Sequence, residues 1–180
     1  MELDKSTIRQ IMKQKRLFLK EETFFHNSQI VLNKVIHHCS YQNANVIGVY
    51  VSMNHEVDTF KLIEHMLKDG KVVVTPKVKG VNMDFYRIHT LDELKEGYFH
   101  VLEPTTDILV SPQDIDLMIV PLLAYNDQNH RVGYGKGYYD RYFFRGFQGY
   151  KLGLAFSFQH VEEIETNEFD YALDEIVNEV

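Results

Sequence analysis

The sequence has one cysteine and lacks any long hydrophobic run. Since a disulfide needs two thiols, Cys39 cannot form one within the chain. No apolar stretch approaches the roughly 20 residues that a membrane-spanning helix requires. The stretch MELDKSTIRQIMKQKR at the amino end is charged and has no apolar run of the kind found in secretory signals. We therefore expect a cytoplasmic protein with no membrane partner.

Positive charge is also scarce. The 19 lysines and arginines are outnumbered by 26 aspartates and glutamates, which gives a formal net charge of -7. General nucleic-acid binders gain affinity by neutralising phosphates, so this balance argues against a nucleic-acid partner but not against a local basic pocket. Internal repeats and low-complexity linkers are missing too. At 180 residues, 44% of them hydrophobic, the chain suits a single domain over 1–180.

Patterns typical of strands and helices alternate along the chain. Helical spacing and capping residues predict a helix after Asp4, and others over 23–38, 57–70, 90–97 and from Tyr138 onward. Short apolar runs predict buried strands over 46–51, 71–76 (ended by Pro76), 116–121 and 150–156, a more exposed strand over 83–88, and a last strand near Ile176. This alternation predicts an α/β fold with a mainly parallel central sheet covered on both faces.

In parallel sheets of this kind, ligands bind beyond the carboxyl ends of the strands. The segments after Val51, Thr75 and Val120 are therefore the places where a site is expected. After Val120 comes HRVGYGKGYYDRYF, over 130–143, in which three glycines alternate with Tyr134 and Lys136 just before a predicted helix.

Gly133, Gly135 and Gly137 can take positive φ and leave backbone N–H groups uncovered. The helix that follows adds free N–H groups and a positive dipole end, so the stretch suits an anion such as phosphate. Lys136 and Arg131 would add positive charge. The stretch matches neither a Walker A loop nor the GxGxxG fingerprint, and by its glycines alone it could equally be a surface loop.

Two other segments carry candidate ligand groups. Lys5, Arg9 and Lys13 are four apart and share one helical face, which either is solvated or contacts an anion. The stretch YVSMNHEVDT follows the first strand, and its Glu56 could accept hydrogen bonds from ring N–H groups of a substrate or could be a surface residue before a helix cap. Met53 could line a flat apolar pocket or merely pack.

In this order, KSTIRQIMK, VSMNHEVDT, TPKV and above all AYNDQNHRVGYGKGYYDRYF resemble the 5-formyltetrahydrofolate cyclo-ligase family, over essentially the whole chain. The resemblance implies a three-layer α/β/α sandwich and an enzyme that uses ATP and Mg²⁺. It implies conversion of 5-formyltetrahydrofolate, with or without a polyglutamate tail, into 5,10-methenyltetrahydrofolate, with release of ADP and phosphate. The formyl oxygen would be phosphorylated before N10 closes the ring. We expect a monomer.

The resemblance also implies roles for particular residues. Lys5 and Arg9 would touch the ATP phosphates, and Lys136 would act on the phosphate being transferred. The nucleotide would be wrapped by Arg131, Val132, Gly133, Tyr134, Gly135, Lys136, Gly137, Tyr138 and Tyr139. The pterin side of the pocket would be formed by Val51, Met53, Glu56, Tyr134 and Tyr138. Asp140 would bind magnesium, with Asp174 as a second acidic ligand. Some members carry an arginine where this chain has Tyr134, which leaves a charge role at that position open.

Two other functions fit the glycine stretch alone. A sugar-phosphate isomerase or coenzyme-A transferase on a similar sandwich would hold phosphate without ATP hydrolysis. A regulatory module would bind ATP without turnover. Only the cyclo-ligase hypothesis accounts for all three segments.

Overall fold

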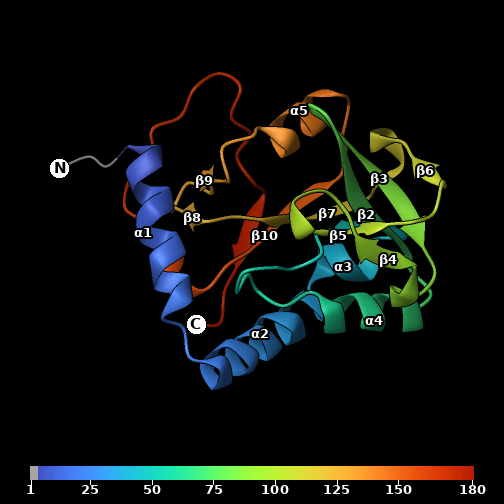
Figure 1. The fold of residues 1–180 in the computed structure, drawn as a ribbon, viewed down its shortest axis with the longest axis horizontal. Helices are drawn as coiled ribbons and strands as arrows, with labels where there is room; N and C mark the ends of the chain where they lie inside the picture. Colours follow the sequence, from blue (N-terminus) through green and yellow to red (C-terminus); the bar gives the residue numbers. More distant parts are fainter. Residues whose placement is uncertain (1–3) are drawn as a thin grey trace.

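The computed structural model of the chain describes residues 4–180, apart from the side chain of Tyr98. Its centre is a seven-stranded sheet in the order β11-β10-β7-β1-β2-β3-β6 (Figure 1). The strands are β1 Val46–Val49, β2 Val72–Lys79, β3 Asn82–Ile88, β6 Leu109–Val110, β7 Leu117–Pro121, β10 Tyr150–Leu154 and β11 Glu175–Val177. From β11 to β2 all neighbours are parallel, whereas β3 and β6 pair antiparallel at one end. The expected mainly parallel sheet is confirmed.

Helices cover both faces of this sheet, but unequally (Figure 1). The helices are α1 Lys5–Leu17, α2 Glu21–Ile36, α3 Cys39–Asn43, α4 Phe60–Lys68 and α5 Tyr138–Phe144. Helices α2, α3 and α4 lie on one face, where Val35, Ile63 and Met66 share a core with strand residues such as Ile47. Of the helices in the described part of the chain, only α5 covers the other face. The α/β/α sandwich is therefore confirmed, with one thin outer layer. None of the helices in the described range is both long and apolar enough to cross a membrane.

Helix α1 covers neither face and stands at the side of the sheet, beside a small hairpin (Figure 1). The hairpin pairs β8 Ala124–Tyr125 with β9 Arg131–Val132. Ile8 and Met12 pack with Leu123 and Val132 in a separate apolar cluster. Asp4 caps the helix as expected, because its carboxylate accepts the backbone N–H of Thr7 at 2.7 Å. This placement brings α1 to the loop that follows the hairpin.

Two strand predictions need correction. Pro76 does not end β2, which continues to Lys79. Strand β1 pairs with β2 only as far as Val74, so beyond that point one edge of β2 is unpaired and a residue without an N–H is tolerated there. Strand β3 is not exposed either: Phe85 and Ile88 are almost fully buried, because helices on both faces reach this part of the sheet.

The segment over 90–97 is the third difference. Thr90 and Glu93 form the expected capping box, but only one 3₁₀ turn follows, over Leu91–Glu93. The chain then becomes β4 Leu94–Glu96, which pairs with β5 Leu102–Pro104. Cross-strand pairing thus overrides the local helix signal. The other 3₁₀ turns are Tyr98–His100, Pro112–Asp114 and Ser157–Gln159.

Phe85 is at the centre of the core beneath α5, and its replacement with alanine tests that layer. Its side chain is fully buried, and its ring centroid lies 4.9 Å from that of Tyr142. We expect Phe85→Ala to lower the free energy of unfolding by about 3–5 kcal/mol, measured by chemical denaturation. Phe144→Ala, on the exposed side of α5, is the matched control and should change it by less than about 0.5 kcal/mol. Equal losses in the two variants would contradict the packing described here.

Candidate active site

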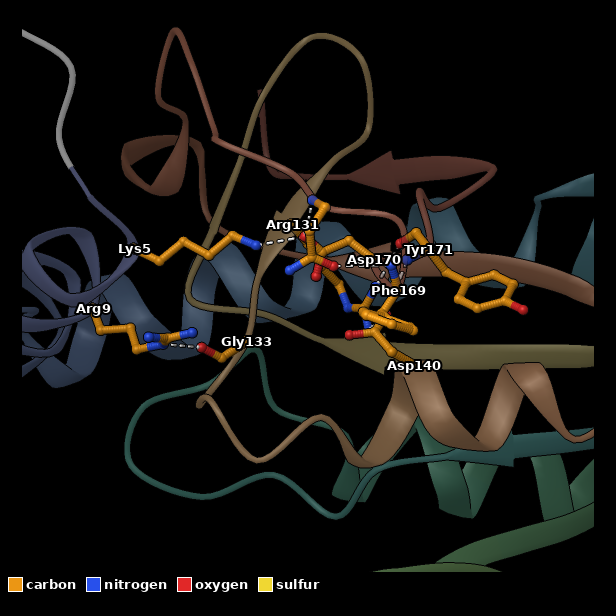
Figure 2. Close-up of polar contacts among 9 residues, drawn as sticks. Lys5, Arg9, Arg131, Gly133, Asp140, Phe169, Asp170 and Tyr171 are labelled. Atoms are coloured by element: carbon orange, nitrogen blue, oxygen red, sulfur yellow. Dashed lines mark hydrogen bonds and ion pairs between the residues drawn. The ribbon is translucent and has the colours of Figure 1, made fainter.

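Two cations of α1, Arg9 and Lys5, point toward the glycine loop and the segment near residue 170, respectively (Figure 2). The Arg9 Nε donates to the Gly133 carbonyl oxygen at 2.8 Å, and the Lys5 Nζ lies 2.5 Å from the Asp170 Oδ2. The Lys13 Nζ is 5.9 Å from the centroid of the Tyr134 ring. This face of α1 is therefore not simply solvated, since each of its three cations meets another part of the chain.

Two of the three loop glycines have a positive φ, a backbone conformation that glycine adopts much more easily than other residues. Gly135 has φ +96° and Gly137 has φ +69°. Gly137 precedes the first residue of α5, and a Cβ there would lie 2.7 Å from an Arg141 Nη atom. A Cβ at Gly135 would be 3.3 Å from the Arg9 guanidinium carbon. Gly133 has no such φ, so its expected role as a third positive-φ residue is wrong.

Arg131 contacts both the start of α5, nine residues on, and the segment around Tyr171, forty residues on (Figure 2). Its guanidinium donates to the Asp140 Oδ1 at 2.9 Å and to the Tyr171 carbonyl oxygen at 2.7 Å. The Tyr171 N–H in turn donates to the same Asp140 oxygen at 3.1 Å. The Arg131 side chain is only 7% exposed. In this structure Arg131 thus fastens α5 to the segment around Tyr171.

The acidic residues expected to bind magnesium lie in different surroundings. Asp140 is in the first turn of α5 and uses Oδ1 for both bonds above. Asp174 instead accepts the Lys151 N–H at 2.7 Å and lies 3.4 Å from the Lys151 Nζ, where β10 and β11 begin. Over residues 4–180 there is no cluster of three or more histidine, cysteine, aspartate or glutamate side chains suited to a metal.

Asp170 is an acidic residue that sequence reasoning missed. It lies between Lys5 and Tyr171, beside the Arg131–Asp140 pair (Figure 2). Burial acts to raise the pKa of Asp170, but hydrogen bonds from Lys5 and the Asn167 N–H outweigh burial and hold the pKa below its ordinary value. Its carboxylate accepts the Asn167 N–H, and the Asn167 side chain accepts the Phe169 N–H in a turn that Asn and Asp favour, which is the signal that the sequence carried.

Glu56 is buried at the carboxyl end of β1. Glu56 is only 4% exposed, so the interpretation of Glu56 as a surface residue before a helix cap is wrong. One carboxylate oxygen accepts the Met53 N–H at 2.9 Å, and the other accepts the Tyr134 hydroxyl at 2.6 Å. Burial raises the pKa of Glu56, against the opposing charge of Arg16 and these hydrogen bonds. The loop after β1 and the glycine loop therefore meet at this carboxylate.

Arg16 is the second residue that sequence reasoning missed. It is 4% exposed, and it donates to the Tyr134 hydroxyl at 2.6 Å and to the Leu122 carbonyl oxygen at 2.6 Å. A charge role at Tyr134 was left open by the sequence, and in the structure a positive charge reaches that position from α1. The signal was present in the sequence, because Arg16 continues the buried row of Ile8 and Met12 at intervals of four.

Lys136 lines a cavity of about 840 Å³, a size that suits a small-molecule ligand. One wall comes from the turn between β2 and β3, which Tyr138 and Arg141 bind through the carbonyl oxygens of Gly80 and Val81. The lining residues are Val78, Gly80, Val81, Asn82, Phe99, Lys136, Tyr138 and Arg141. Tyr134 and Lys136 are two residues apart, so the loop that contacts Glu56 also lines this cavity.

The remaining predicted residues contribute in different ways. Val51 and Val132 are 5% and 1% exposed, so their side chains belong to the core. Met53 is partly exposed beside Glu56. Tyr139 packs against Phe85, and burial raises the pKa of its hydroxyl. Any ligand contact made by Val132 would therefore come from its backbone.

These features place the chain among the α/β proteins whose ligand groups gather beyond the carboxyl ends of a parallel sheet. Comparison with known proteins identifies the group more closely. The family model described as the 5-formyltetrahydrofolate cyclo-ligase family matches residues 2–179. The chain therefore belongs to the 5-formyltetrahydrofolate cyclo-ligase family, and it is an enzyme of that family.

Individual relatives agree in sequence and in fold. The mouse 5-formyltetrahydrofolate cyclo-ligase is 31% identical over 97% of this chain and 93% of its own length. The NMR structure of the Aquifex aeolicus 5,10-methenyltetrahydrofolate synthetase is 34% identical, with a TM-score of 0.88 over 97% of this chain and 89% of that one. The Mycoplasma pneumoniae 5,10-methenyltetrahydrofolate synthetase is 28% identical, with a TM-score of 0.81 over 99% and 100% of the two chains.

Proposed function

We propose that this enzyme converts 5-formyltetrahydrofolate into 5,10-methenyltetrahydrofolate at the expense of ATP, with release of ADP and phosphate. The observation that carries the proposal is the meeting of three segments, far apart in sequence, at the carboxyl edge of the sheet. Helix α1 brings Lys5 and Arg9, the glycine loop brings Lys136, and the loop after β1 brings Glu56. Membership of the family supports the same reaction.

The chemical problem is to expel the formyl oxygen. Transfer of the γ-phosphoryl group to that oxygen turns it into a phosphate ester, which is a far better leaving group. N10 then attacks the formyl carbon, the new N–C bond forms, the C–O bond breaks, and the oxygen departs within inorganic phosphate while N10 loses its proton. The protein has to align the oxygen with the phosphorus and to offset the charge that moves with the phosphoryl group.

In the proposed mechanism the glycine loop provides this alignment. Gly135 and Gly137 hold the backbone in a conformation that keeps N–H groups available, and Lys136 extends from between them into the cavity wall. A lysine there acts as a point charge on the phosphoryl oxygens. Lys5 and Arg9 would hold the remaining phosphates from the side of α1, and Lys5 would exchange Asp170 for a phosphate oxygen.

Magnesium would be held by carboxylates at the start of α5. Asp140 fits, because both of its protein hydrogen bonds use Oδ1 and a hard cation prefers a carboxylate oxygen together with substrate phosphates. Asp170 is better placed than Asp174 to be the second acidic group, since Asp170 lies beside the Arg131–Asp140 pair, whereas Asp174 binds Lys151 where β10 and β11 begin. When bound, the ion would neutralise phosphate charge during transfer.

Glu56 would orient the pterin through its ring N–H groups. A carboxylate accepts such hydrogen bonds when ionised, and Glu56 is held by fixed partners on both oxygens. Val51, Met53 and Tyr138 would complete this side of the pocket. Every proposed group comes from one chain, which is consistent with action as a monomer. The proposed place of action is the cytoplasm, and a polyglutamate tail on the substrate is compatible with an open cavity.

The test is to incubate the protein with 5-formyltetrahydrofolate, ATP and Mg²⁺ and to follow the absorbance band of the methenyl product. We expect a band that requires all three, with ADP formed in equal amount. A protein that binds ATP but gives neither product would favour the regulatory module. A protein that acts on a phosphorylated sugar or on an acyl-coenzyme A without forming ADP would favour the isomerase or transferase.

A further inference from the structure

A row of three polar groups runs from α1 to the proposed pterin carboxylate; its two charged ends, Arg16 and Glu56, are buried, whereas the Tyr134 residue between them is 39% exposed. The Arg16 guanidinium donates to the Tyr134 hydroxyl, and that hydroxyl donates to the Glu56 carboxylate, each at 2.6 Å. A hydroxyl has one proton, so accepting from Arg16 commits it to donate to Glu56. The order of donor and acceptor along the row is therefore fixed by the positive charge at one end and the negative charge at the other.

Arg16 itself is held firmly. Its second terminal nitrogen donates to the Leu122 carbonyl oxygen just after β7, and its own carbonyl oxygen lies 3.1 Å from the Nδ1 of His55. His55 has φ +56° and directly precedes Glu56, so the last turn of α1 rests on the loop that carries the carboxylate. The Arg16 Nε is buried without a hydrogen-bond partner. A buried cation with an unmet donor is costly to the folded state, so its retention in the core calls for a compensating role.

We propose that Arg16 is a positioning residue for the folate substrate, which acts through Tyr134 to hold Glu56 in place as an ionised acceptor. The inference rests on the proposed role of Glu56 toward the pterin. Tyr134 belongs to the same loop as Lys136, so the row also ties the carboxylate that orients the pterin to the lysine that contacts the phosphate. Arg16 would thus set the distance between Glu56, which orients the pterin, and Lys136, which contacts the phosphate, without touching folate or ATP.

The surroundings of Glu56 explain why a distant charge matters. The Tyr134 hydroxyl donates to Glu56, the charge of Glu56 contributes to the raised pKa values of the Tyr50 and Tyr139 hydroxyls, and the charge of Arg16 acts to lower the pKa of Glu56. Lys13 faces the Tyr134 ring rather than the carboxylate. Burial raises the pKa of Glu56 and the charge of Arg16 opposes that rise. Without Arg16 the pKa would rise further, and the ionised form would be lost at a higher pH.

The test compares Arg16→Met and Tyr134→Phe with Lys15→Met, a control that removes an exposed cation from the same helix. We expect Arg16→Met to weaken binding of 5-formyltetrahydrofolate about tenfold or more in calorimetric titrations without ATP, and to raise KM for folate more than KM for ATP. The acidic limb of kcat/KM should move to higher pH. Tyr134→Phe should give the same pattern in weaker form, and Lys15→Met should behave as the wild type.

Two further variants keep the outcome decisive. Arg16→Lys retains the charge, so the acidic limb of its kcat/KM pH profile should lie at the wild-type pH even if Arg16→Met folds poorly. Thermal unfolding of each variant measures whether it is folded. Glu56→Gln separates the two hypotheses. If the wild type turns over folate but Glu56→Gln binds it normally, the proposed role of Glu56 is wrong. If Glu56→Gln binds weakly while Arg16→Lys, Arg16→Met and Tyr134→Phe all match the wild type, the role of Arg16 is wrong.

Discussion

Replacing Lys136 with alanine is expected to lower kcat about 100-fold or more while leaving the fold intact. The Lys136 side chain is exposed at the cavity wall and packs against no core, so its loss should not alter the free energy of unfolding. In the proposed mechanism, the charge of Lys136 is needed when the phosphoryl group is between ATP and the formyl oxygen. The measurement is the initial rate of methenyl product formation at saturating ATP and folate, together with a thermal unfolding curve.

The control for this prediction is Lys68→Ala, which removes an exposed lysine from α4 on the opposite face of the sheet. It should retain the wild-type rate. Lys136→Arg adds a further distinction, because it keeps the charge but changes the geometry, and a partial rate would show that position matters as well as charge. A Lys136→Ala enzyme with an unchanged kcat would rule out the role given to this lysine.

Asp140→Asn is expected to have two effects at once. The Mg²⁺ concentration needed for half-maximal activity should rise about tenfold or more, because a carboxylate oxygen is replaced by a neutral amide. The free energy of unfolding should also fall by about 1–3 kcal/mol, since the buried Arg131 loses its negatively charged partner. A magnesium titration of the rate and a chemical denaturation curve measure the two effects separately.

Asp170→Asn and Asp174→Asn identify the second acidic group. If the assignment made here is right, Asp170→Asn shifts the magnesium titration and Asp174→Asn leaves it unchanged, because the Asp174 carboxylate binds Lys151 where β10 and β11 begin. A shift with Asp174→Asn alone would restore the assignment made from the sequence. An Asp140→Asn enzyme with a normal magnesium titration would remove this residue from the proposed metal site.

Much of the fold could be predicted because local patterns and burial agreed. Val46–Val49 and Leu117–Pro121 are apolar runs that a parallel sheet buries on both faces, and α5 begins at Tyr138 as its glycine-rich approach indicates. The failures occurred where pairing between distant strands decided the outcome. Pro76 remains within β2 because the neighbouring strand β1 pairs with β2 only as far as Val74. Leu94 lies in a segment predicted to be helical, but it pairs with β5 instead.

The candidate site was predictable where its residues lie in one continuous loop. Lys136 and Asp140 follow from the glycine stretch itself, but Asp170 and Arg16 reach the site through side-chain partners more than a hundred residues away, Lys5 for Asp170 and Tyr134 for Arg16. Hydrogen bonds of that kind leave no periodic trace. Arg16 is the exception, because its position four residues after Met12 in the buried row of α1 could have been found from spacing alone.

The same distances bear on when the site can form during synthesis. Arg9 meets Gly133 across 124 positions, and Lys5 meets Asp170 across 165. During synthesis the α1 sequence leaves the ribosome long before Gly133 or Asp170. Helix α1 therefore cannot form these polar contacts until most of the strands of the sheet have been synthesised. Closing such long loops is slow and costs entropy. The contacts of Lys5 and Arg9, in the part of the site proposed to bind the nucleotide, should therefore form among the last events of folding. A chain stalled before residue 170 would contain every strand of the main sheet except β11 but would lack the Lys5–Asp170 contact.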